Sequence, residues 1–199
     1  MRRDNQPALI VIAGPNGSGK STITKDLEKR PGFPDIYINA DDIKKNEGLT
    51  DLEAWEKAEQ QRADALDNGE SFAFETVFSH ESKLELMKQA KESGYWVRLY
   101  FVCTQDSDVN VRRVKTRYGT GGHDVPVDKI RSRYKRSMQL LSHSFSLADE
   151  AMVFNNSWEK PELIAQKTSD GKITVYPLHD KDPRSAWTKR EIEKLLGIQ

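Results

Sequence analysis

The stretch ALIVIAGPNGSGKST, residues 8–22, holds an apolar run followed by a glycine-rich turn. The apolar run Ala8–Ala13 predicts a buried strand, and Gly14–Ser21 matches the GxxxxGKS pattern of a phosphate-binding loop, after which a helix begins. Glycines allow several backbone N–H groups to point at a polyphosphate, and the positive end of the helix adds to the attraction. A strand–loop–helix unit that binds phosphate is therefore the first prediction.

The same loop predicts the ligand. Lys20 is placed to reach the β- and γ-phosphates of a nucleotide, and the Ser21 hydroxyl is placed to ligate Mg²⁺. We expect ATP with Mg²⁺, with GTP as the alternative nucleotide. A chance glycine-rich turn is the competing interpretation, which the flanking strand and helix patterns disfavour. The residues predicted to hold the nucleotide are Gly14, Asn16, Gly17, Ser18, Gly19, Lys20, Ser21 and Thr22.

Composition narrows the class of protein. A chain of 199 residues is typical of a single domain with a real core. Lys plus Arg and Asp plus Glu both total 31, and this balance disfavours nucleic acid as a partner. Cys103 is the single cysteine, which fits a reducing cytoplasm, and no apolar run is long enough to span a membrane.

Strand and helix patterns alternate along the chain. Short apolar runs bounded by turns alternate with helical spacings, which predicts an α/β fold with a mostly parallel five-stranded core sheet and helices on both faces. The predicted strands are 8–13, 36–38, 71–76, 96–103 and 151–154, and the predicted helices are 20–29, 52–66, 81–91, 109–117 and 127–141. Ligands are then expected beyond the carboxyl ends of the strands.

The last forty residues have a weaker pattern. Residues 163–167 and 173–176, around Asp170-Gly171, resemble a hairpin, and a closing helix is predicted over 185–196. We expect one domain over residues 1–199, with a basic lid at about 112–136 and a hairpin-helix tail at about 160–199.

Two adjacent carboxylates follow the second predicted strand. Phosphoryl transfer needs an acceptor hydroxyl that is aligned and relieved of its proton, and Asp41 or Asp42 is a candidate for that base. Aspartate is also a frequent helix cap, so one of the two is open to that role while the other faces the cleft. With Asp41 as the base, Asp42 is predicted to contact the acceptor.

Polar residues also end the third predicted strand. Glu75 is a candidate to order Mg²⁺ through water or to bind acceptor hydroxyls, with a solvated strand end as the plain alternative, and Thr76 adds a hydrogen-bonding group. The fourth strand ends in Cys103-Thr104-Gln105, without the aspartate that holds Mg²⁺ in ATP-driven motors. This absence favours a small kinase over a motor.

A basic stretch surrounds the loop 119–126. Its arginines are candidates to clamp phosphate oxygens and to stabilise charge in the transition state, although most of them are expected on solvated helix faces. Arg117 and Arg133 are the two we predict to act in catalysis, since they flank the loop. His123 is predicted to orient the substrate, with a contact to Asp124 as the alternative.

Several motifs together resemble the zeta toxin family of kinases. They are GPNGSGKST (14–22), INADDIKK (38–45), FAFET (72–76), GGHDVP with KIRSRYKRS (121–137), and ADEAMVFNNS (148–157). The first motif is common to many nucleotide hydrolases, whereas the combination, and above all GGHDVP followed by the basic run, is much more specific.

This resemblance implies a P-loop kinase-like three-layer sandwich and a phosphotransferase with an alcohol acceptor. The best-known members phosphorylate a sugar hydroxyl of UDP-N-acetylglucosamine, which poisons cell-wall synthesis, and a protein antitoxin neutralises them. The family's base falls on Asp41, its loop lysine on Lys20, and its acceptor-binding residues on Glu75 and Thr76. Its lid arginines fall in the basic stretch, where Arg117 and Arg133 match best.

Two other functions stay open at this point. One is a nucleotide-dependent switch or interaction module with slow hydrolysis and no acceptor. The other is a nucleic-acid end kinase, which the basic stretch favours and the neutral net charge disfavours.

Overall fold

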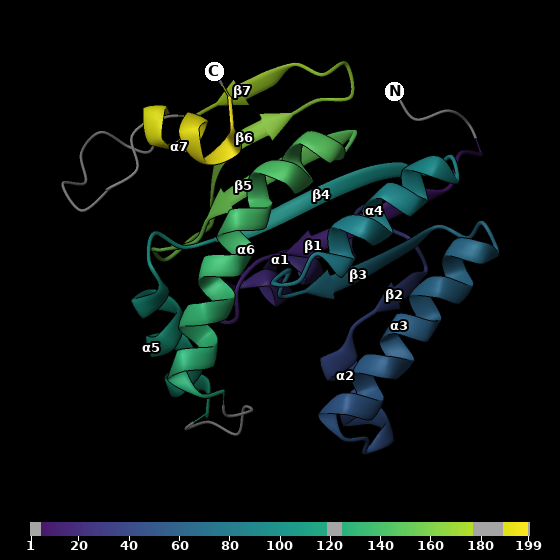
Figure 1. Ribbon diagram of the computed structural model, residues 1–199, viewed down its shortest axis with the longest axis horizontal. Coiled ribbons are helices and arrows are strands. Elements are labelled where there is room, and N and C mark those ends of the chain that lie inside the picture. Colours follow the sequence, from purple (N-terminus) through teal and green to yellow (C-terminus); the bar gives the residue numbers. More distant parts are fainter. Residues whose placement is uncertain (1–4, 119–124, 177–188, 199) are drawn as a thin grey trace.

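One sheet of seven strands forms the centre of the computed structural model, which describes residues 5–118, 125–176 and 189–198 (Figure 1). In spatial order the strands are β2 (Ile36–Ile38), β3 (Phe72–Thr76), β1 (Ala8–Ala13), β4 (Trp96–Cys103), β5 (Glu150–Asn155), β6 (Glu162–Lys167) and β7 (Ile173–Val175). The first five in this order are parallel, whereas β6 and β7 run antiparallel to their neighbours. The carboxyl ends of the five parallel strands therefore meet at one edge.

The predicted five-stranded sheet is wrong in its strand number. Residues 160–176, which we assigned to a tail, supply the β6–β7 hairpin that extends the sheet beyond β5. Ile164 and Ala165 of β6 are fully buried, so the hairpin adds to the core as well as to the backbone ladder. The hairpin itself was predicted correctly, but local spacing carries no information about which open edge a hairpin joins.

Helices cover both faces of the sheet, as predicted. They are α1 (Lys20–Leu27), α2 (Ala40–Glu47), α3 (Asp51–Asp67), α4 (Ser82–Glu92), α5 (Ser107–Tyr118), α6 (Val127–Leu147) and α7 (Lys189–Leu196). α6 continues six residues past the predicted end at Leu141. Residues 177–188 lie outside the described part, so only residues 189–196 of the predicted closing helix are described, as α7. None of the described helices is both long and apolar enough to cross a lipid bilayer.

The alternating side chains of β1 separate two cores. Leu9 and Val11 face the larger core, to which α3, α4, α6 and α7 contribute buried residues. Ile10 and Ile12 face the smaller core, which Leu27 of α1 completes on the opposite side of the sheet. This three-layer arrangement buries β1 on both faces, which explains why its sequence is apolar at every position.

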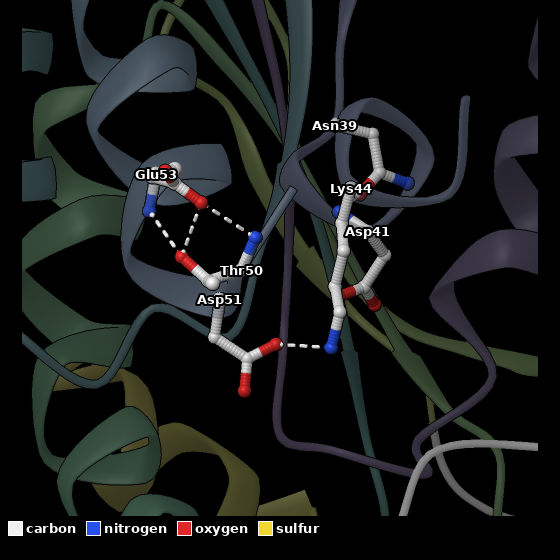
Figure 2. A network of polar contacts seen from close by, with 6 residues as sticks. All are labelled: Asn39, Asp41, Lys44, Thr50, Asp51 and Glu53. Atoms are coloured by element: carbon white, nitrogen blue, oxygen red, sulfur yellow. Dashed lines mark hydrogen bonds and ion pairs between the residues drawn. The ribbon is translucent and has the colours of Figure 1, made fainter. Parts of the chain in front are cut away.

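The helices α2 and α3 form an arm, residues 40–67, that connects β2 to β3: α2 lies opposite α5 and the first half of α6, and α3 runs back alongside the sheet (Figure 1). Figure 2 shows two contacts that organise the arm. Lys44 of α2 pairs with Asp51 of α3 at 2.6 Å, and Thr50 forms a capping box with Glu53 at the start of α3. The capping box satisfies orphan N–H groups at the helix start and so fixes where α3 begins.

We expect the substitution Thr50→Ala to lower the free energy of unfolding by about 1 kcal/mol, because it removes the side chain that accepts from the Glu53 N–H. Denaturant-induced unfolding measures the change. Thr50→Ser keeps the hydroxyl and is the matched control. Equal stability of the Ala and Ser variants would contradict this role of the cap.

Candidate nucleotide and acceptor site

The glycines of the loop 14–21 lie where no side chain fits. Gly14 and Gly19 have positive φ angles of +144° and +93°. A Cβ at Gly14 would lie 2.0 Å from the carbonyl oxygen of Val102, and a Cβ at Gly19 would lie 2.2 Å from Nδ2 of Asn156. The loop is therefore pressed against the ends of β4 and β5, and only glycine allows this approach.

Side chains from two other segments hold the backbone of the loop. Asn110 of α5 donates from Nδ2 to the carbonyl of Asn16 at 2.6 Å. Asn156, directly after β5, donates from Nδ2 to the carbonyl of Ser18 at 2.7 Å. Arg113 donates in turn to the carbonyl of Asn156 at 2.6 Å, which ties α5 to the same segment. These bonds fix the loop in one shape before any ligand arrives, which lowers the entropy cost of binding.

The sequence analysis missed the roles of Asn110 and Asn156. Asn156 follows a predicted strand, and its position at the carboxyl end was the available signal. Asn110 lies on a helix and is fully buried, so nothing in its local pattern points to the loop.

The loop presents hydrogen-bond donors and positive charge that suit a polyphosphate. The Ser18 hydroxyl is fully buried and has no hydrogen-bond partner among the described residues. α1 begins at Lys20, within the loop motif, and its first N–H groups carry partial positive charge. A buried hydroxyl without a partner, a helix start and the ammonium of Lys20 together suit the negatively charged oxygens of phosphate groups.

The charges of three other predicted site residues, Glu75, Asp41 and Arg117, act on Lys20. Its ammonium is buried, and it donates to the carbonyl of Pro15 at 3.1 Å. Burial lowers the pKa of Lys20, and the nearby positive charge of Arg117 lowers it further, whereas the carboxylates of Glu75 and Asp41 raise it. The structure thus brings residues from α1, β3, α2 and α5 within electrostatic reach of one another.

Glu75, at the end of β3, is the centre of a hydrogen-bonded group on the α1 side of the sheet. Its carboxylate accepts from the Ser21 hydroxyl at 3.1 Å, from the Thr24 hydroxyl at 2.9 Å and from the Tyr37 hydroxyl at 3.3 Å. No group of three or more His, Cys, Asp and Glu side chains among the described residues is arranged to hold a metal alone. The Ser21 hydroxyl with the Glu75 carboxylate nevertheless forms an oxygen set that suits Mg²⁺, which keeps most of its waters.

Neither aspartate of the pair caps α2. Asn39 does so, because its side chain accepts from the Asp41 N–H at 3.0 Å, as its position in Figure 2 illustrates. The carboxylates of Asp41 and Asp42 are therefore not used in capping. Partial loss of water around Asp42, with the negative charges of Glu75 and Asp41 nearby, raises the pKa of Asp42.

The other predicted site residues have different surroundings. Arg133 of α6 donates to the Asn16 side chain at 3.4 Å, so it touches the loop. Thr76 accepts the Gly14 N–H with its carbonyl at 3.2 Å and the Phe78 N–H with its hydroxyl at 3.2 Å, so it supports the loop backbone. The Thr22 N–H donates to Gly19 within the first turn of α1. His123 lies outside the described residues.

Comparison of the sequence with known families gives a match. The family model described as Zeta toxin matches residues 1–168. An uncharacterized protein of Haemophilus influenzae is 32% identical over 134 residues, which cover 65% of this chain and 94% of that protein.

Solved structures share the fold. The AvrRxo1-ORF1:-ORF2 complex matches with a TM-score of 0.66 at 17% identity over 85% of this chain, and its structure with ATP matches with the same TM-score. The chain spans only about 61% of the length of that protein. A structure from the PezAT chromosomal toxin-antitoxin system of Streptococcus pneumoniae matches over 100% of this chain and 81% of its own, with a TM-score of 0.59 at 14% identity.

We expect Glu75→Gln to lower the pKa of Asp42 toward its ordinary value of 3.8, because the negative charge that disfavours ionisation of Asp42 is removed. Carbon NMR of the carboxyl groups across a pH titration measures it. Glu47→Gln, on the far end of α2, is the control and should leave the pKa of Asp42 in place. An unchanged Asp42 titration in the Glu75 variant would show that the two carboxylates do not share a site.

Proposed function

The chain belongs to the zeta toxin family, and we propose on this basis that it is an ATP-dependent kinase that phosphorylates a hydroxyl of a small molecule. The acceptor we propose is a sugar or a nucleotide sugar, with UDP-N-acetylglucosamine as the first candidate. The chain would act in the cytoplasm as one domain, and a protein antitoxin is its proposed partner. ATP is the proposed donor, with GTP as the alternative.

The single observation that carries the proposal is that the carboxylate of Asp41, which does not cap a helix, lies near enough to Lys20 for its charge to act on that lysine. The charge of Asp41 acts on the ammonium of Lys20, although the two residues belong to different α/β units of the chain. Asn39 provides the helix cap, so the Asp41 carboxylate has no structural duty in the helix start. Phosphoryl transfer to a hydroxyl needs a phosphate that is held in place and a carboxylate opposite it that accepts the hydroxyl proton.

In the proposed reaction, Asp41 accepts the proton of the acceptor hydroxyl while the oxygen of that hydroxyl forms a bond to the γ-phosphorus. The bond from that phosphorus to the β,γ-bridging oxygen breaks, and the nucleoside diphosphate leaves. Lys20 is placed to stabilise the charge that develops on the phosphate oxygens, and Arg133, which touches Asn16, would approach the loop from α6.

Two groups complete the proposed site. Mg²⁺, when bound, would neutralise phosphate charge, and Ser21 with Glu75 would hold it, in part through water. Arg117 is the second proposed catalytic arginine, because its positive charge acts on Lys20. Residues 112–136 around it form the proposed lid. We propose that Asp42, Thr76 and His123 contact the acceptor, and that Glu75 shares this role with its metal role.

We expect Asp41→Asn to keep ATP affinity within about twofold and to slow phosphoryl transfer by about 10²–10⁴-fold, the range of a positioned general base. The measurement uses γ-labelled ATP with a metabolite extract that includes UDP-sugars, followed by identification of the labelled product. Asp26→Asn, on the exposed side of α1 next to Lys29, is the matched control and should transfer at the normal rate.

An unchanged rate in the Asp41 variant would remove this residue from the mechanism, and loss in Asp42→Asn instead would assign the base to its neighbour. Label on added oligonucleotides rather than on metabolites would favour the nucleic-acid end kinase. Hydrolysis without any labelled product would favour the nucleotide-dependent switch.

We expect Lys20→Ala to abolish detectable transfer, because both the grip on the phosphates and the charge at the transition state are lost. Circular dichroism must first establish that the variant is folded. Lys25→Ala, in the same helix but exposed, is the control and should retain activity. A folded Lys20 variant that still transfers phosphate would contradict the proposed role of the loop.

A further inference from the structure

Three charged side chains meet between the arm and α4, away from the phosphate-binding loop. Glu59 of α3 accepts from Nη2 of Arg62 at 2.6 Å, and the same carboxylate oxygen accepts from Nζ of Lys83 at the start of α4. We call these three residues the cationic cluster. Two positive groups thus share one carboxylate oxygen.

The cationic cluster keeps its positive charges below the surface and its negative charge at the surface. The side chains of Arg62 and Lys83 are 4% and 9% exposed, whereas that of Glu59 is 33% exposed. Arg62 also stacks over the ring of Phe74, with its guanidinium carbon 5.2 Å from the ring centroid. The carboxylate therefore covers two cations that water reaches poorly.

The charges of the cationic cluster do not balance. Within the described ranges, Glu59 forms the ion pairs of both Arg62 and Lys83, so two positive charges face one negative charge. Nε of Arg62 is buried, and no described residue accepts from it. An excess buried cation and an unused donor both cost free energy, and a second anion would offset that cost.

The cluster joins α4 to α3, and α3 packs against α2, the helix that carries Asp41. α4 follows β3, whose last residues are Glu75 and Thr76, and α3 follows α2, which carries Asp41. Trp55 is one helical turn before Glu59, on the same side of α3, and it is 50% exposed. A molecule that places its hydroxyl near Asp41 and extends along α3 toward α4 would pass the ring of Trp55 and approach the two cations of the cluster.

We propose that Arg62 and Lys83 form an anion subsite for the acceptor, with Glu59 as an internal carboxylate that occupies this subsite until the acceptor displaces it. The inference rests on the proposed function and deepens it: the acceptor carries a phosphate or a carboxylate in addition to its reacting hydroxyl. Glu59 can leave without breaking the core, because it is the exposed member of the cluster.

A purely structural clamp between α3 and α4 makes the opposite prediction for one variant. If Glu59 only ties the two helices together, then Glu59→Gln weakens the protein and creates no affinity for anions. If Glu59 competes with an incoming anion, then Glu59→Gln exposes two cations and increases that affinity.

The test measures binding of inorganic phosphate by calorimetry to the full chain saturated with a non-hydrolysable Mg-ATP analogue, so that the loop 14–21 is already filled. We expect one phosphate to bind the wild type, about tenfold tighter binding to Glu59→Gln, and about tenfold weaker binding to Lys83→Met. Matched controls come from the exposed pair in α4, Glu85→Gln and Lys88→Met, which should bind phosphate as the wild type does. Acetate in place of phosphate distinguishes a carboxylate subsite from a phosphate subsite.

The proposal is overturned if Glu59→Gln binds phosphate no more tightly than the wild type, or if Lys83→Met binds it equally well. Binding of the ATP analogue and circular dichroism, measured on each variant, establish that it is folded. These readouts require no catalysis, so a failure of the subsite is distinguishable from a failure of the proposed kinase activity, which the labelled-extract experiment tests.

Discussion

The close approach of the phosphate-binding loop to two neighbouring strand ends is the constraint on which the site depends. Gly14 meets the end of β4 and Gly19 meets the residue after β5, with no space for a Cβ at either position. Because β4 pairs in register with β1 on one side and with β5 on the other, the sheet itself sets the position of the loop. The amide of Asn156 then holds the loop from the same strand end.

From that fixed loop, the placement of charge follows. Lys20 begins α1, and its buried ammonium donates to the carbonyl of Pro15, so the loop fixes where this positive charge lies. The negative charge of Glu75, on the adjacent strand β3, and that of Asp41, on the arm, both act on this ammonium. The arm is held by its own contacts, the Asn39 cap and the Lys44–Asp51 ion pair, so the carboxylate of Asp41 takes its position from α2 rather than from the loop.

Elements with strong local signals were predictable. β1 and α1 were correct because an apolar run and a GxxxxGKS motif each fix a backbone conformation within a few residues. The hairpin 162–175 was also recognised, whereas its place in the sheet was not, since pairing with β5 depends on an edge that lies elsewhere in the chain. Glu75 was predicted as a polar residue at a strand end. Its contacts with Ser21, Thr24 and Tyr37 were not predicted, because they too depend on segments that lie elsewhere in the chain.

The sequence by itself determined the phosphate-binding loop, the α/β alternation and the resemblance to one family, because these are written in contiguous residues. Only the tertiary structure decided that Asn110 and Asn156 hold the loop, and that Arg62 and Lys83 share the carboxylate of Glu59. Those contacts join residues up to 138 positions apart, as between Ser18 and Asn156. Their chemistry depends on burial and proximity, which a chain acquires only when its distant segments pack together.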